Sequence, residues 1–180
     1  MSDERRFLIG DRPGFSPQIA RLVSMLTYAR ETTLEAAAGL DVAALDFQAD
    51  AQSNSIAALL LHVAAVETWY QAATFEGREL DAGEMREWEA PLDLGERARR
   101  EIRGHDLDHY AGKLSEVRAR TLSELARRDD RWLEEETPFW KGLPANNHFK
   151  WFHVLEDELS HRGQIRWLRK RAERRDPSVS

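Results

Sequence analysis

Residues 152–165 read Phe-His-Val-Leu-Glu-Asp-Glu-Leu-Ser-His-Arg-Gly-Gln-Ile, and the apolar period of this stretch predicts a helix packed in a helical core. The positions that share one face of that helix, at steps of three or four residues, are Val154, Asp157, His161, Ile165 and Leu168. A helix of a globular protein turns such a face toward the core. Burying an acid and a histidine there costs free energy unless a partner binds both side chains.

Three more segments carry apolar residues at helical spacing. We expect the first helix from Ser16-Pro17 to Gly39 and the second from about Ser53 to Phe75. The third spans Gly95 to Arg128 with a bend at Gly104, and the last runs from Asn146 or Asn147 to about Arg174. Two long connections, 77–95 and 129–147, separate these helices, and no stretch alternates as a strand would. The pattern predicts an all-α four-helix bundle with two long connections.

Composition limits the kind of protein further. The 180 residues predict a single domain over 1–180 with its core at about 15–174. The net charge of −6 argues against a nucleic-acid partner. The longest apolar run, Ile56 to Val66, is too short to span a bilayer, and the N-terminus does not resemble a signal peptide. We therefore expect a cytoplasmic protein with neither a membrane nor a nucleic acid as partner.

A histidine on the second helix completes a candidate metal site. His62 shares an inward stripe with Leu59, Val66 and Trp69, just as Asp157 and His161 share one on the last helix. Two histidines and one carboxylate are a recognised set for a divalent cation, and they leave coordination positions open for water or substrate. The chain has no cysteine, so a metal must be held by nitrogen and oxygen, and any thiol must come from outside.

Other readings of the polar residues stay open at this point. Asp157 and His161 could form a buried hydrogen bond with a protonated imidazole. His105 and His109 have the spacing of a metal pair but lie beside the apolar stripe of their helix, so we expect them at the surface. His153, one turn before Asp157, is a candidate hydrogen-bond partner of the site or an alternative ligand.

Two details of the last helix carry further expectations. Gly163 lies inside the helix, where glycine costs about 1 kcal/mol relative to alanine, so it predicts a close approach by another backbone or a ligand. Arg162 is expected to pair with Glu158, four residues earlier.

Two motifs resemble a known group of proteins. The segment Ser55–Val63 with Glu67 and Trp69, followed by the His-Arg-Gly-Gln sequence at 161–164, is similar to the DinB-like superfamily. This group includes the YfiT-type metal-dependent enzymes and the mycothiol-dependent maleylpyruvate isomerase type. The resemblance implies a four-helix bundle, often a homodimer, with a divalent metal held by three side chains. Zinc or nickel is the first expectation, and iron or manganese the next.

The resemblance also assigns the ligands. It places the histidine of the second helix at His62 and that of the last helix at His161. The residue four positions earlier is commonly histidine, and in some branches glutamate; here it is Asp157, a shorter carboxylate.

Two functions follow from different classes of protein. The first is a divalent-metal-dependent enzyme, either an S-transferase that uses a low-molecular-weight thiol or a hydrolase. A metal-bound thiol or water would be its nucleophile. The alternative is a non-catalytic binding or dimerisation module whose metal site is structural or vestigial. The residues do not identify the small-molecule substrate or a catalytic side chain beyond His62, Asp157 and His161.

Overall fold

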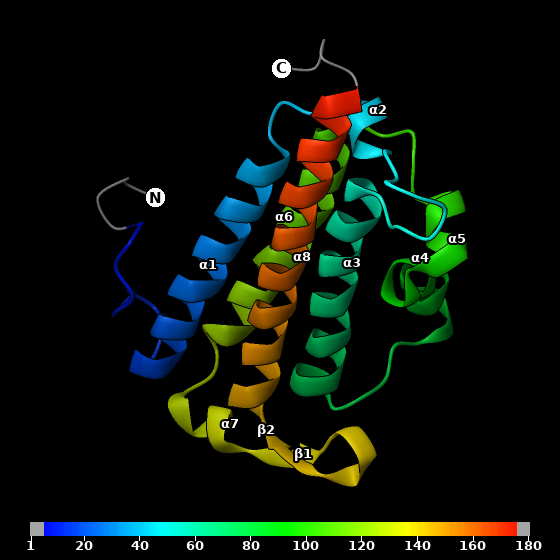
Figure 1. The fold of residues 1–180 in the computed structure, drawn as a ribbon. Coiled ribbons are helices and arrows are strands. Elements are labelled where there is room, and N and C mark those ends of the chain that lie inside the picture. The colour runs from blue at the N-terminus through cyan, green and yellow to red at the C-terminus, as the bar shows by residue number, and fades with distance from the viewer. Residues whose placement is uncertain (1–5, 176–180) are drawn as a thin grey trace.

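Four long helices lie side by side in the computed structural model, which describes residues 6–175 (Figure 1). They are α1 (Pro17–Ala37), α3 (Ile56–Gln71), α6 (Leu107–Leu125) and α8 (Asn147–Arg175). Helix α8 contacts α1 and α3, and α3 also contacts α6. The predicted all-α four-helix bundle is confirmed.

Capping residues fix where the helices begin. Ser16 precedes Pro17 at the start of α1, as predicted. The Ser55 hydroxyl accepts a hydrogen bond from the Ala58 amide, so α3 begins a few residues later than expected. At the start of α8, the Asn146 side chain accepts from the Phe149 amide at 2.8 Å.

The connection between α3 and α6 is more helical than the sequence suggested. After the π-helical turn Ala72–Glu76 it forms α4 (Ala82–Asp93) and α5 (Gly95–Glu101). The start of α4 is fixed by a capping box between Asp81 and Glu84. The expectation of one bent helix from Gly95 to Arg128 is wrong. Gly104 has a φ of +81°, outside the helical range, and Asp106 caps a new helix, α6.

The second connection contains a small hairpin. It begins with α7 (Asp130–Glu134) and continues through β1 (Glu136–Pro138) and β2 (Pro144–Asn146), which pair antiparallel. The expectation that the chain has no strand is therefore wrong. The two strands have three residues each, too few for an alternating pattern to be recognised. A short helix, α2 (Val42–Leu45), lies between α1 and α3.

Helix α3 lies deep in the bundle. Together with the turn that follows it, the stretch Ile56–Glu76 is long and apolar enough to cross a membrane. In this structure, however, 78% of its apolar 18-residue stretch is buried against the rest of the chain. Burial within a helical bundle accounts for this composition, because a central helix is apolar all round.

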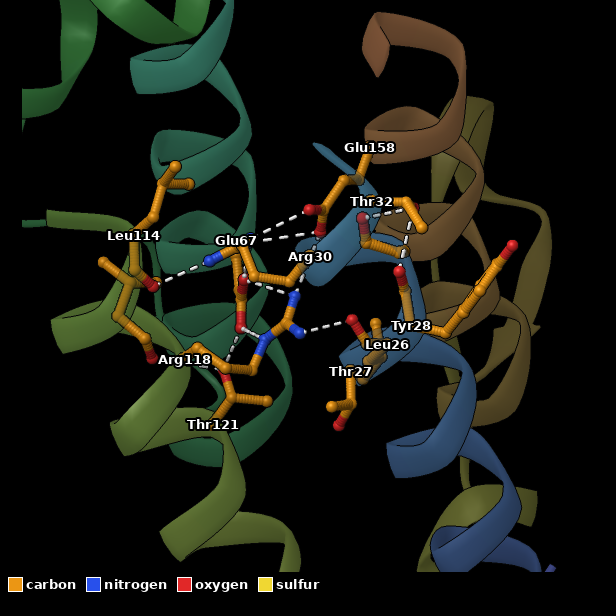
Figure 2. Close-up of polar contacts among 12 residues, drawn as sticks. Leu26, Thr27, Tyr28, Arg30, Thr32, Glu67, Leu114, Arg118, Thr121 and Glu158 are labelled. Carbon is orange, nitrogen blue, oxygen red and sulfur yellow. Dashed lines mark hydrogen bonds and ion pairs between the residues drawn. The ribbon is translucent and has the colours of Figure 1, made fainter. Parts of the chain in front are cut away.

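Charged side chains also meet inside the bundle (Figure 2). Arg30 of α1, Glu67 of α3, Arg118 of α6 and Glu158 of α8 form what we call the buried ion cluster. Arg30 donates to Glu158 at 2.8 and 3.2 Å and to Glu67 at 2.9 Å. Arg118 donates to Glu67 at 2.7 and 3.1 Å and to Glu158 at 3.1 Å. Each of the four bundle helices thus contributes one charge.

The remaining polar atoms of the cluster are also paired. Arg30 Nη1 donates to the Leu114 carbonyl and Arg118 Nη1 to the Leu26 carbonyl, both at 2.7 Å. Burial alone would raise the pKa of Glu67, but Arg118 and Arg30 hold it at about 2. Such pairing is what makes charge tolerable in a core.

Candidate metal centre

Helices α3 and α8 bring the three predicted ligands together. His62 Nε2 lies 3.8 Å from Asp157 Oδ1, and His161 Nε2 lies 3.4 Å from the same oxygen. The two imidazole rings meet edge to face with centroids 4.7 Å apart. One ligand atom from each residue lies within 4.8 Å of the others, and no second group of three or more such residues occurs in the described part of the chain.

Hydrogen bonds on the far side of each imidazole orient it. His62 Nδ1 lies 2.7 Å from the Pro91 carbonyl. This carbonyl is in the last turn of α4, where helical carbonyls lack a partner within the helix. Because a carbonyl only accepts, Nδ1 carries the proton and Nε2 keeps its lone pair for a cation. His161 Nδ1 faces Gln164 Oε1 at 3.3 Å in the same manner.

Asp157 is only partly satisfied. Its Oδ2 atom is buried and has no hydrogen-bond partner among residues 6–175. Burial alone would raise the pKa of Asp157, but pairing with His161 and His62 holds it well below its ordinary value. Burial would likewise lower the pKa of His62, yet Asp157 and the Pro91 carbonyl raise it. The carboxylate is therefore ionised at neutral pH, which is the form that binds a cation.

A pocket of about 490 Å³ is lined by two of the three residues, His62 and Asp157. Around His62 and Asp157 its walls are mainly apolar and aromatic: Val66, Trp69, Tyr70, Met85, Leu92 and Trp140. Asp93 and His153 add polar groups. We call this cavity the metal pocket. The side chains of His62, Asp157 and His161 are 12%, 19% and 13% exposed. A small molecule in the pocket can therefore reach His62 and Asp157, which line it.

The other histidines lie apart from this set. His105 and His109 are exposed, as expected, with their rings stacked at 4.0 Å. His153 lies in the metal pocket with Nδ1 3.0 Å from Glu156 Oε2, and it does not belong to the three-residue group. Sequence reasoning missed Pro91, because nothing in the chain indicated that α4 would end against α3.

Two expectations for the last helix, a close backbone approach to Gly163 and an Arg162–Glu158 pair, are wrong, whereas the approach of a ligand to Gly163 stays a prediction. A Cβ atom added at Gly163 would meet nothing within 4 Å, so no backbone or side chain of the described residues approaches it closely. Glu158 does not pair with Arg162, because it points into the buried ion cluster. Arg162 donates to Thr32 of α1 instead.

Fold and motifs together define a DinB-like helical bundle. A family model described as Mycothiol-S-transferase matches residues 21–173. Because the match covers most of the sequence, the chain belongs to this family, which lies within the DinB-like superfamily. A search of curated proteins finds no match.

Proposed function

We propose that this protein is a metal-dependent S-transferase that uses mycothiol, with the metal held by His62, Asp157 and His161. The observation that carries the proposal is the buried, unpartnered Oδ2 of Asp157 beside two imidazoles, whose Nε2 atoms converge on Asp157 Oδ1 while their Nδ1 atoms face oxygen acceptors. Two of the three ligand separations are close to those around a bound cation. Ligands at about 2.0–2.2 Å from a tetrahedral ion lie about 3.3–3.6 Å apart, close to the 3.4 and 3.8 Å separations observed.

The donor set suits several ions. Two imidazoles and a carboxylate bind zinc, nickel, iron or manganese, and zinc or nickel is our first choice. When bound, such an ion would act as a Lewis acid that lowers the pKa of a coordinating thiol. Family membership favours a thiol over water as nucleophile, and the absence of cysteine means that an external thiol supplies it.

The chain's own residues would position the substrates and handle the proton. Burial, followed by the charge of Asp157, raises the pKa of the Tyr70 hydroxyl far above its ordinary value. The Tyr70 hydroxyl therefore stays protonated and can donate a hydrogen bond in the pocket. His153 Nδ1 faces the carboxylate of Glu156, which leaves Nε2 as an acceptor for the thiol proton. The apolar walls would exclude water that competes with the thiol.

Metal analysis and turnover test the proposal together. Untagged wild-type protein is expected to carry about one divalent metal per chain and to transfer mycothiol to 1-chloro-2,4-dinitrobenzene. His62→Ala and Asp157→Ala are each expected to lose both properties. His105→Ala is the matched control, because it removes an exposed histidine outside the group and should keep both.

The result that overturns the proposal is a wild-type protein without stoichiometric metal that gains neither activity nor stability when zinc or nickel is added. That outcome would favour the non-catalytic binding or dimerisation module.

A further inference from the structure

A second pocket lies next to the metal pocket. It has a volume of about 430 Å³ and lies between the β1–β2 hairpin and the start of α8. Six apolar or aromatic residues form most of its wall: Phe139, Trp140, Leu143, Pro144, Ala145 and Phe149. We call it the hairpin pocket. Trp140 lines both pockets, so the two cavities share one wall.

The apolar side chains of the hairpin pocket are unusually open to solvent. Leu143 is 66% exposed, Trp140 is 60% exposed and Phe149 is 43% exposed. Scattered apolar residues are common on protein surfaces, but clustered ones that line a cavity indicate a binding surface. The chemistry of these walls suits an alkyl or aryl group.

One face of α8 runs along both pockets. Phe149, His153, Asp157 and His161 follow one another at four-residue steps, and each step rises about 6 Å along the helix. The His153 ring lies parallel to Phe149 with centroids 6.4 Å apart and meets Trp140 edge to face at 5.0 Å. A molecule that reaches from Asp157 to Phe149 would span about 12 Å.

We infer that the hairpin pocket binds the apolar part of the electrophilic substrate, whose reacting carbon lies in the metal pocket. This inference rests on the proposed function. It assigns the substrate to a class: an elongated electrophile with an alkyl or aryl group about 12 Å from its reactive end. Mycothiol is a sugar-bearing thiol, and a wall of this composition offers its hydroxyls few partners.

N-alkyl-2-chloroacetamides are suitable probes of this arrangement. The thiol sulfur attacks the carbon that bears chlorine, a carbon–sulfur bond forms, and chloride leaves with the electron pair of the broken bond. The thiol proton passes to His153 or to solvent. Chain length can then be varied from methyl to octyl without any change at the reacting carbon.

The expected result is a KM that falls as the chain grows, by up to roughly fourfold for each methylene that becomes buried. In Phe149→Ser this dependence on chain length should flatten, while the KM for mycothiol stays unchanged. Phe152→Ser is the matched control. Phe152 is a neighbouring phenylalanine, 49% exposed, that lines neither pocket, so this variant should behave like the wild type.

A binding measurement tests the hairpin pocket independently of the transfer reaction. N-octylacetamide has no leaving group, and its affinity can be measured by calorimetry or by tryptophan fluorescence. It should bind the wild type and Phe152→Ser alike and bind Phe149→Ser at least tenfold more weakly. If this holds while no chloroacetamide reacts, the S-transferase proposal fails and the apolar subsite stands.

One result would overturn the inference itself: N-octylacetamide affinity that is unaffected by Phe149→Ser. Sedimentation of the same variant then shows whether its state of association has changed instead. In that case this face would be an interface between copies of the chain.

Discussion

Helices α3 and α8 contribute side chains to two polar clusters, which differ in how completely their charges are paired. In the buried ion cluster, Glu67 and Glu158 accept hydrogen bonds from both arginines. In the candidate metal centre, Asp157 has one carboxylate oxygen without any partner among the described residues. A fully paired cluster can hold a fold together, whereas an unpaired buried oxygen indicates a site for a ligand.

Residues that are neighbours in the sequence belong to different clusters. Asp157 and Glu158 are consecutive on α8, about 100° apart around the helix axis. One therefore faces the metal pocket while the other faces the bundle centre. On α3, His62 likewise faces the metal pocket, whereas Glu67 faces the bundle centre. The rotation of each helix about its own axis therefore determines which of its side chains enter each cluster.

The largest effect should come from breaking the buried ion cluster. Glu158→Ala leaves two buried guanidinium groups short of partners and is expected to lower the free energy of unfolding by about 3–5 kcal/mol. Urea denaturation measures this change. Glu173→Ala is the control, since it removes a more exposed ion pair with Arg169 and should cost under about 0.5 kcal/mol. A cost below about 1 kcal/mol for Glu158→Ala would mean that the cluster has no structural role.

Acid should weaken the same cluster. The folded-state pKa of Glu67 is about 2, below its ordinary value of 4.5. Its stabilising contribution is therefore complete above about pH 4.5 and is lost as the pH falls toward 2. The loss should be about 3 kcal/mol in the free energy of unfolding. Urea titrations at several pH values measure it, and Glu67→Gln should give a flatter curve over this range. Parallel curves would contradict the assignment.

At the metal centre, Asp157→Asn changes charge with little change in shape. We expect it to weaken zinc binding more than about 100-fold, because the amide lacks the negative charge of the ligand that it replaces. Asp157→His introduces the residue that the superfamily commonly has here, and it should keep the metal. Calorimetric titration with zinc distinguishes these results. Wild-type affinity in the Asn variant would exclude Asp157 as a ligand.

The smallest effect is expected from a residue that orients a ligand. Gln164→Ala removes the oxygen that faces His161 Nδ1 and should weaken metal binding about 10-fold. The free energy of unfolding should stay the same, because Gln164 is exposed. Gln164→Glu supplies another acceptor and should restore the affinity. If all three proteins bind metal equally, Gln164 has no part in the site.

Much of the candidate site could be read from helical periodicity. Residues at steps of three and four on two apolar stripes must share a face, which placed His62, Asp157 and His161 inward. The buried ion cluster was missed even though Arg30 follows Ala29 on the apolar face of α1. A single charge beside a stripe could equally face solvent, and only its pairing with Glu67 and Glu158 of other helices shows that Arg30 is buried.

The sequence by itself determined the four long helices apart from the start of the third, the inward faces that carry the candidate ligands, and the family to which the chain belongs, because these depend on residue order and local spacing. The single domain, homodimer, metal identity and compartment stay predictions. Only the tertiary structure decided that α4 ends against His62, that the hairpin brings Trp140 to the metal pocket, and that four charges from four helices meet. Such contacts join residues distant in the chain, and the packing of the helices selects them rather than local propensity.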